Sequence, residues 1–188
     1  MSKGANAIIR IDGNDAYVDV STPKFPDAVA IISAIDLPLM LDGRGTWCAA
    51  KVKSKSDTLY VVRGIGGRKS RRTELLHRVI LGLSNPLSQG DHGSGDGLDN
   101  RWGNLRYASN AQNSRNGRRH ADGTSRFKGV SWDPKRKRWQ AGIGIDRKRL
   151  ALGRFKSEVA AARAYDKAAL LHHGEFARLN FPLSRARQ

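Results

Sequence analysis

The pattern of apolar and polar positions changes twice along the chain. In residues 1–69 short β-rich runs predominate: AIIRIDG and DAYVDV flank the turn Asp12-Gly13-Asn14-Asp15, and TWCAAKV and TLYVVRG flank a polar loop. Apolar runs around glycine and asparagine predict hairpins. The segment DAVAIISAIDLPLM instead favours a short helix that ends before Pro38. We therefore expect a β-rich scaffold in this region.

The second part follows a basic, glycine-rich stretch, GIGGRKSRR, which reads as a linker. In TELLHRVILGL the apolar residues recur at helical spacing, which predicts one helix. Residues 90–116 then hold few apolar residues but many asparagines, in GDHGSGDGLDNRWGNLRYASNAQNSRN. We expect a strand ending at Asp91-His92, a loop over 93–103, a strand over NLRYA and a brief helix capped by Ser109.

The third part predicts three strands and one helix. FKGVSW, RWQAGIGI and RLALGRF are the strands, and Ser157 is placed to cap a helix with a small-residue face. The second strand alternates strictly, which predicts an apolar face toward the helix and an outward polar face. The apolar set is Trp139, Ala141, Ile143 and Ile145, and the outward set is Arg138, Gln140, Gly142 and Gly144.

Charge separates these parts further. The net charge is +17, yet residues 1–60 hold seven Lys/Arg and seven Asp/Glu, so residues 61–188 carry the whole excess. A basic excess on one side of the chain favours a nucleic-acid partner over a merely solvated surface or an anionic membrane. The predicted divisions are a scaffold over 1–69, a central module over 70–118, a basic linker over 119–123, a basic domain over 124–182 and a basic tail over 183–188.

The expected localisation and redox chemistry rest on three features: hydrophobic run length, the N-terminal pattern and the cysteine count. The sequence has no apolar run of membrane-spanning length and no secretory signal pattern at MSKGANAIIR, and Cys48 is its one cysteine. A single cysteine excludes an internal disulfide framework and a thiolate zinc cluster. We expect a cytoplasmic protein.

The asparagine-rich segment is either a polar turn of no consequence or a site for a metal ion and a water. Asp91 and His92 are adjacent, Asn104 follows the histidine by twelve residues, and Asn113 follows it by twenty-one. Each residue alone has an ordinary explanation as a turn or solvated position, and only their conjunction favours a site. Asn100 and Asn110 are secondary candidates.

This segment resembles the HNH endonucleases, specifically the ββα-metal site of the homing type found in phage genomes. The resemblance rests on DH, LDNR, NLR and QN in this order, with LHRVIL before them. It implies that His92 is the general base and that Asp91 and Asn113 bind one Mg²⁺, or Mn²⁺, through hard oxygens. Asn104 is expected to hydrogen-bond the histidine ring and fix its direction. If the gene belongs to a phage, the location is the host cytoplasm.

The third part resembles the plant ethylene-response-factor (Apetala-two type) DNA-binding domain. The matching elements are KGV, a tryptophan on the second strand, LGRF, AARAYDKAAL and FARLNFP. The resemblance implies that the sheet enters the major groove while the helix backs it. Since Gly142, Gly144 and Ser131 stand where the plant domains carry charged residues, we expect phosphate contacts to outweigh base readout.

The candidate DNA-binding residues are mostly basic and lie on the outward face, in its turns or in the basic segment before it. They are Arg115, Arg118, Arg119, Arg126, Lys128, Ser131, Trp132, Lys135, Arg136, Lys137, Arg138, Gln140, Arg147, Arg149 and Arg154.

Together these features predict an α+β protein: a β-rich N-terminal region with a ββα-metal site, and a three-stranded antiparallel sheet packed on one helix. The expected function is metal-dependent cleavage of duplex DNA, as a strand-nicking endonuclease without a small-molecule cofactor or a membrane partner. The alternative is a non-catalytic, sequence-tolerant DNA-binding regulator with a degenerate nuclease module. An RNA-binding module would instead need exposed aromatics on the sheet, for which Trp132 is the candidate. Monomer and dimer remain open.

Overall fold

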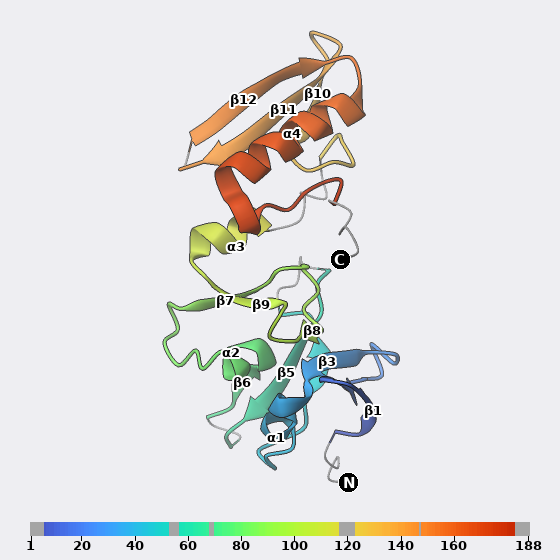
Figure 1. Cartoon of the computed structure of the whole chain (residues 1–188), viewed down its shortest axis with the longest axis vertical. Coiled ribbons are helices and arrows are strands. Elements are labelled where there is room, and N and C mark those ends of the chain that lie inside the picture. The colour runs from blue at the N-terminus through green and yellow to red at the C-terminus, as the bar shows by residue number, and fades with distance from the viewer. Residues whose placement is uncertain (1–5, 53–56, 68–69, 117–122, 147, 183–188) are drawn as a thin grey trace. The chain divides into compact units, whose positions relative to one another are not determined.

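The chain forms two compact units, residues 1–110 and residues 111–188. The computed structural model describes residues 6–52, 57–67, 70–116, 123–146 and 148–182 (Figure 1). Both units combine strands with helices, which confirms the α+β class. The division falls at the start of α3 (Asn110–Asn116). Of the expected linker over 119–123, all but Gly123 lies outside the described residues.

The first unit contains three separate sheets in its described residues. Their strand orders are β1-β2-β3-β8, β4-β5-β6 and β7-β9, and β8 runs parallel to β3 while the other pairs are antiparallel. The strands are β1 (Ile8–Asp12), β2 (Asp15–Asp19), β3 (Val29–Ser33), β4 (Cys48–Ala50), β5 (Tyr60–Ile65), β6 (Arg72–Leu75), β7 (Gln89–His92), β8 (Asp99–Asn100) and β9 (Leu105–Ala108).

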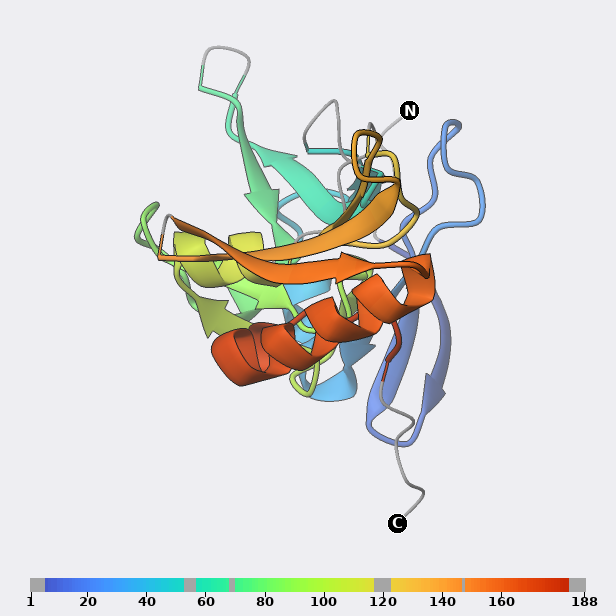
Figure 2. The same cartoon turned by 90° about the horizontal axis from the view of Figure 1, so that it is seen from above.

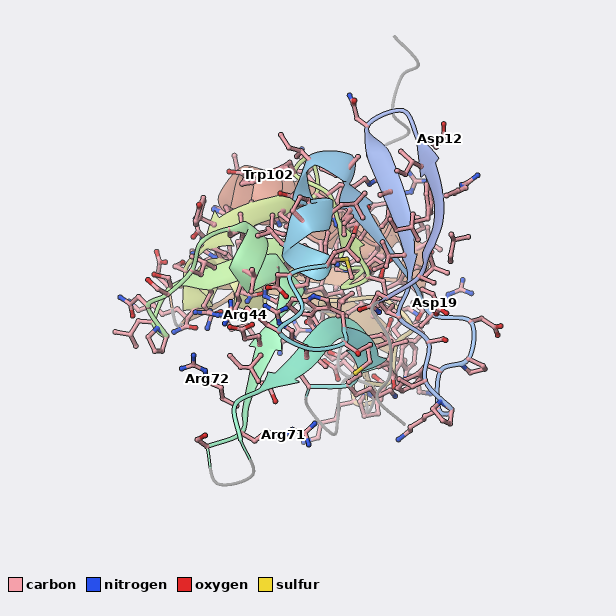
Figure 3. The ribbon with its side chains drawn as sticks, turned by 90° about the horizontal axis from the view of Figure 1, so that it is seen from below. Asp12, Asp19, Arg44, Arg71, Arg72 and Trp102 are labelled. Atoms are coloured by element: carbon pink, nitrogen blue, oxygen red, sulfur yellow. The ribbon has the colours of Figure 1, made fainter. Side chains whose placement is uncertain are left out.

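The two hairpins predicted in the first unit are confirmed. In the first, Gly13 has a φ of 57°, which suits glycine in a two-residue loop. Figure 3 labels Asp12 at the outer end of this β1–β2 hairpin. In the second hairpin, Cys48 and Ala50 of β4 lie opposite Val62 and Tyr60 of β5.

The short helix predicted in DAVAIISAIDLPLM, ending before Pro38, is wrong for most of its length. Val29–Ser33 forms β3, which lies between β2 and β8, and the helical part is limited to η1 (Ala34–Asp36) and α1 (Leu37–Met40). Pro38 stands in the first turn of α1, where a missing backbone N–H costs nothing, so it opens the helix and does not stop it. Strand pairing on both sides overrides the helical spacing.

The helix predicted over TELLHRVILGL is also shortened by pairing. Its first residues belong to β6, and only α2 (Leu76–Ile80) is helical. Glu74 lies opposite Arg63 of β5, and its carboxylate accepts a hydrogen bond from Arg63 Nε at 2.9 Å. The stretch read as a linker is therefore the connection between the two strands β5 and β6 of one hairpin. Figure 3 labels Arg71 and Arg72 at the end of this connection.

A single apolar core holds the first unit together. It includes Ile32, Met40, Trp47 and Leu76, each at most 1% exposed. The guanidinium of Arg63 lies over the Trp47 ring at 4.3 Å and donates to both carboxylate oxygens of Asp42. A buried arginine needs anionic partners to offset the loss of solvation, and the Asp42 carboxylate is such a partner for Arg63.

The second unit is the predicted three-stranded antiparallel sheet backed by one helix, and this part of the prediction is confirmed. Its elements are α3, β10 (Val130–Asp133), β11 (Arg138–Ile145), β12 (Lys148–Phe155), α4 (Glu158–His173) and η2 (Gly174–Phe176). Figure 2 shows α4 running along one face of the sheet. Ser157 caps α4, with its side-chain oxygen accepting from Ala160 N.

Small side chains let α4 approach the sheet closely. Ala161, Ala162 and Ala169 are fully buried beneath the inward face of β11. Gly129 has a φ of 74°, and a Cβ there would lie 2.0 Å from the Tyr165 ring. The packing therefore demands glycine at position 129. No helix within the described part of the chain has both the length and the apolar character needed to cross a bilayer.

Candidate nucleic-acid interface

The face of the C-terminal sheet opposite α4 is polar and basic. On β11, Trp139, Ala141, Ile143 and Ile145 pack in the two apolar clusters beneath α4, as the alternation predicted. The register then assigns the neighbouring positions to the other face, which we call the outer face. It carries Ser131, Asp133, Arg138, Gln140, Gly142, Gly144, Arg149, Ala151 and Arg154.

Hydrogen bonds organise one end of the outer face. Gln140 Nε2 donates to Ser131 Oγ at 3.0 Å, across the β10–β11 pair. The carboxylate of Asp133 accepts from Arg154 Nε at 3.3 Å, from Arg136 Nη1 at 3.3 Å and from the Arg136 backbone N–H at 3.1 Å. The Arg136 backbone bond first, and then the two arginine side chains, lower the pKa of Asp133. The carboxylate therefore stays ionised and holds both arginines.

The other end of the outer face is hollow. Gly129, Gly142 and Gly144 line a depression of about 410 Å³ together with Lys148 and Arg149. A Cβ at Gly142 would lie 2.8 Å from Arg149 Nε, so the glycine leaves room for this side chain to lie across the strand. Cations beside a shallow, glycine-lined surface suit contact with a phosphate backbone.

Between β10 and β11, the turn exposes Lys135, Arg136 and Lys137. Arg126 is also exposed, with its guanidinium 3.7 Å from Glu158 and over the Phe127 ring. These side chains reach solvent from the sheet's border, where phosphates of a bound duplex would pass.

Two of the predicted residues do not lie on the outer face. Lys128 donates to the backbone oxygen of Arg115 at 2.6 Å, in a pocket that also includes Ile143, Tyr165 and His173 on the α4 side. Burial and the nearby Arg178 lower the pKa of Lys128 to about 8. Trp132 lies opposite Trp139 and packs edge-on against it, on the apolar side of the sheet. The expectation that Lys128 belongs to the outward face is therefore corrected.

Other predicted residues are placed away from the sheet or not described. Arg115 lies in α3, with Nη2 at 3.6 Å from Asp146 Oδ1. Arg118, Arg119 and Arg147 lie outside the described residues.

In the first unit, the Asp-His pair stands at the end of β7, as predicted, but its carboxylate is already paired. Asp91 lies opposite Arg106 of β9, and its Oδ2 accepts from Arg106 Nε at 2.9 Å and from Nη2 at 2.6 Å. The side chains are only 6% and 18% exposed. Asp91 and Arg106 thus form a buried salt bridge in which two guanidinium nitrogens donate to one carboxylate oxygen.

His92 is buried in a cluster of rings. Its ring centroid is 4.9 Å from that of His77 and 5.8 Å from that of Tyr60. Burial lowers the pKa of His92 despite the opposing effects of Asn100 and nearby carboxylates. Burial, with repulsion from His92 and Arg78, lowers the pKa of His77 to about 3. Both imidazoles are therefore neutral at physiological pH.

The predicted role of Asn104 is wrong. Its Oδ1 accepts from the Ser94 backbone N–H at 2.8 Å, and its Nδ2 donates to the Asp99 backbone oxygen at 2.6 Å, so its amide shapes the loop. The amide near the ring is that of Asn100, whose Oδ1 lies 3.3 Å from His92 Nε2. Asn113 belongs to α3 in the second unit, whereas Asp91, His92 and Asn104 belong to the first.

These contacts do not fit the expected divalent ion. Asp91 Oδ2 accepts two hydrogen bonds from the Arg106 guanidinium, so the carboxylate expected to bind Mg²⁺ or Mn²⁺ already has a cationic partner. No cluster of three or more His, Cys, Asp or Glu suited to a metal occurs among the residues the structure describes. The ββα-metal arrangement is therefore not shown.

Two residues with decisive contacts, Arg106 and Asp133, were missed by the sequence analysis, and a third, Asn100, was named only as a secondary candidate. Arg106 pairs with Asp91, Asn100 meets the His92 ring, and Asp133 holds two arginines. Asp133 could have been found from strand alternation, because it lies on the same face as Ser131. The other two depend on pairing across β7 and β9 and on the fold of the loop between them.

Comparison with known proteins gives a match for the second unit. A family model described as the AP2 domain matches residues 125–174. A rice (Oryza sativa subsp. japonica) AP2/ERF and B3 domain-containing protein is 50% identical over 62 residues, which are 33% of this chain and 17% of that protein. APETALA2-like protein 2 of Oryza sativa subsp. indica is 46% identical over 63 residues, 32% of this chain and 14% of that protein. The matches thus span less than a fifth of these relatives.

These findings overturn the enzyme prediction. The family model and the relatives named here are of the AP2 DNA-binding type, and none of them is a nuclease. The AP2 domain binds double-stranded DNA. The fold and the sequence match agree on one point: residues 125–174 of this chain match the AP2 domain and contain the three-stranded sheet with the helix α4.

Proposed function

We propose that this protein is a non-catalytic DNA-binding regulator that holds duplex DNA on the outer face of its C-terminal sheet. The main support for DNA binding is the charge of the outer face. Arg138, Arg149 and Arg154 lie there on neighbouring strands, beside the basic turn of residues 135–137. A three-stranded sheet fits the major groove, and cations along its border suit the phosphates on either side.

Duplex DNA is favoured over single-stranded RNA by the absence of aromatic side chains on the described outer face. Trp132, the candidate for stacking, packs against Trp139 on the α4 side. Stacking platforms for unpaired bases need an aromatic ring on the exposed face. The cationic and amide side chains of the outer face instead suit the phosphates and base edges of a paired duplex.

A non-catalytic role agrees with the first unit. The Asp91–Arg106 salt bridge and the neutral His92 ring are both buried. We infer that this unit is a scaffold or a partner module whose nuclease-like sequence is degenerate.

The test is equilibrium binding of the full chain to a labelled duplex, to single-stranded RNA and to the duplex at rising salt. We expect preference for the duplex, and a linear fall of log affinity with log salt at about 0.9 per phosphate contact. Arg149→Ala should weaken binding, while Lys167→Ala, which removes the same charge from the exposed side of α4, should not.

The same binding reactions test the absence of catalysis. Supercoiled plasmid incubated with the protein and Mg²⁺ should be recovered uncut. Equal binding of RNA and duplex, or equal loss from Arg149→Ala and Lys167→Ala, would refute the outer face as the DNA site.

A further inference from the structure

One row of side chains crosses all three strands of the outer face. Ser131 lies directly opposite Gln140, and Gln140 lies directly opposite Arg154. Opposite residues in an antiparallel sheet have Cβ atoms about 4.5–5.5 Å apart, so the three side chains are neighbours. Asp133, two residues after Ser131 on β10, reaches Arg154 from the adjacent row.

Each of the two long side chains in this row is held by a shorter one. Gln140 gives one amide hydrogen to Ser131 Oγ at 3.0 Å. Arg154 gives its Nε hydrogen to Asp133 Oδ2 at 3.3 Å and keeps 49% of its side chain exposed. Among hydrogen bonds between described residues, Gln140 Oε1, its second amide hydrogen and both terminal nitrogens of Arg154 stay unused.

The groups that stay unused match two base edges in the major groove. An amide oxygen beside an amide N–H matches the N6 donor and N7 acceptor of adenine. The paired terminal nitrogens of a guanidinium match O6 and N7 of guanine. Ordering by Ser131 and Asp133 lowers the entropy cost of these bidentate contacts.

We propose that Gln140 reads adenine and Arg154 reads guanine at neighbouring base pairs, and that Ser131 and Asp133 are their positioning residues. This inference rests on the proposed function, and it adds a short sequence preference to binding otherwise dominated by phosphates. Neighbouring strands are about 4.8 Å apart. Stacked base pairs are about 3.4 Å apart, so two long side chains on adjacent strands converge on adjacent pairs.

The glycines of β11 explain why the row of Ser131, Gln140 and Arg154 is the part of the outer face expected to contact bases. Beyond it, β11 offers only Gly142 and Gly144 on the outer face, with Arg149 lying over Gly142. This half of the face has no β11 side chain to meet a base edge. On the other side of the row, Arg138 donates through Nη1 to the backbone oxygen of Lys137 in the turn, so base-specific contacts from β11 are expected mainly from Gln140.

The experiment is selection of binding sites from a random duplex library by the full chain, followed by affinity measurements on the selected duplex. The parent should enrich an adenine next to a guanine. Changing either base should lower affinity about tenfold or more. Gln140→Ala should erase the preference at the adenine pair alone, and Arg154→Ala the preference at the guanine pair alone.

The positioning residues have their own readout. Ser131→Ala should weaken the adenine preference, with affinity for unselected duplex kept within about twofold, because phosphate contacts are untouched. Ser131→Thr keeps the hydroxyl and should restore the preference. Asp133→Asn should weaken the guanine preference in the same way. Lys135→Ala, by contrast, should lower affinity for every sequence equally. Thermal melting of each variant separates these effects from misfolding.

Three outcomes overturn the proposal. A base preference that survives both Gln140→Ala and Arg154→Ala assigns the reading to other residues. Equal binding of all duplexes removes base reading but leaves the proposed DNA-binding function intact. Failure of the parent to bind any duplex removes the proposed function together with the reading built on it.

Discussion

Two aspartate–arginine pairs, one in each unit, show how burial changes the role of the same chemistry. In the Asp91–Arg106 pair the oxygen and nitrogen lie 2.6 Å apart, and the side chains are 6% and 18% exposed. In the Asp133–Arg154 pair they lie 3.3 Å apart, and Arg154 is 49% exposed. The first pair is buried within the first unit. The second holds Arg154 through its Nε and leaves its side chain about half exposed to solvent.

This difference explains why the nuclease-like segment misleads. An Asp-His pair followed by spaced asparagines supplies the residue types for metal-dependent hydrolysis, yet Arg106 satisfies the carboxylate internally. On the C-terminal sheet, by contrast, basic residues that are ordinary in sequence lie together on one face, and this shared position suggests DNA binding. Neither outcome depends on residue type alone, and variants that unbalance each pair test the comparison.

The largest effect is expected from Arg106→Ala. It leaves the Asp91 carboxylate buried without its cation, which should lower the free energy of unfolding of the first unit by about 3–5 kcal/mol. Urea denaturation measures this change. Arg44→Ala is the matched control, since Arg44 pairs at 3.5 Å with Glu74 but is 54% exposed. Equal effects from both variants would contradict the contrast between buried and exposed pairs.

Acid should weaken the first unit next most strongly. The pKa of His77 is lowered from 6.5 to about 3, so between these pH values the unfolded chain binds a proton that the folded chain does not. Stability is therefore complete above pH 6.5 and falls as pH drops. Between pH 7.5 and pH 5 the expected loss is about 2 kcal/mol.

Denaturation of His77→Phe at the same two pH values tests the origin of this loss. The variant keeps a ring in the cluster but cannot titrate, so its pH dependence should shrink. Some should persist, because burial also lowers the pKa of His92. An unchanged slope would show that His77 is protonated in the folded protein.

A smaller effect, on binding and not on folding, is expected in the second unit from replacing Lys135, Arg136 and Lys137 together by alanine. Loss of three phosphate contacts should reduce the slope of log affinity against log salt by about 3. Salt titration of duplex binding measures it. If the variant kept the parent's slope of log affinity against log salt, the phosphate contacts would have to come from residues other than these three.

The smallest change in stability is expected from Asp133→Asn. Its arginine partners are about half exposed, so water already solvates the charges and the free energy of unfolding should hardly change. Denaturation beside Arg106→Ala gives the comparison directly. A loss as large as that of Arg106→Ala would mean that Asp133 supports the fold and is not mainly a positioning residue.

Much of the second unit followed from sequence because its signals are local. Strict alternation on β11 assigned Gln140 to one face and Ile143 to the other, and Ser157 marked the start of α4. Local patterns failed in the first unit at Val29–Ser33 and Arg72–Leu75, where strand neighbours distant in sequence decided the conformation. The roles of Asn104 and Asn100 were exchanged for the same reason.

The sequence by itself determined the basic C-terminal charge, the three strands and helix of the second unit, and the division of β11 into two faces. These depend on composition and on the two-residue repeat of a strand, which act over short distances. Only the tertiary structure decided that Arg106 meets Asp91, that Lys128 turns toward α4, and that Asp133 holds Arg154. Charge partners are chosen by strand register and burial, and both arise only when distant segments pack together.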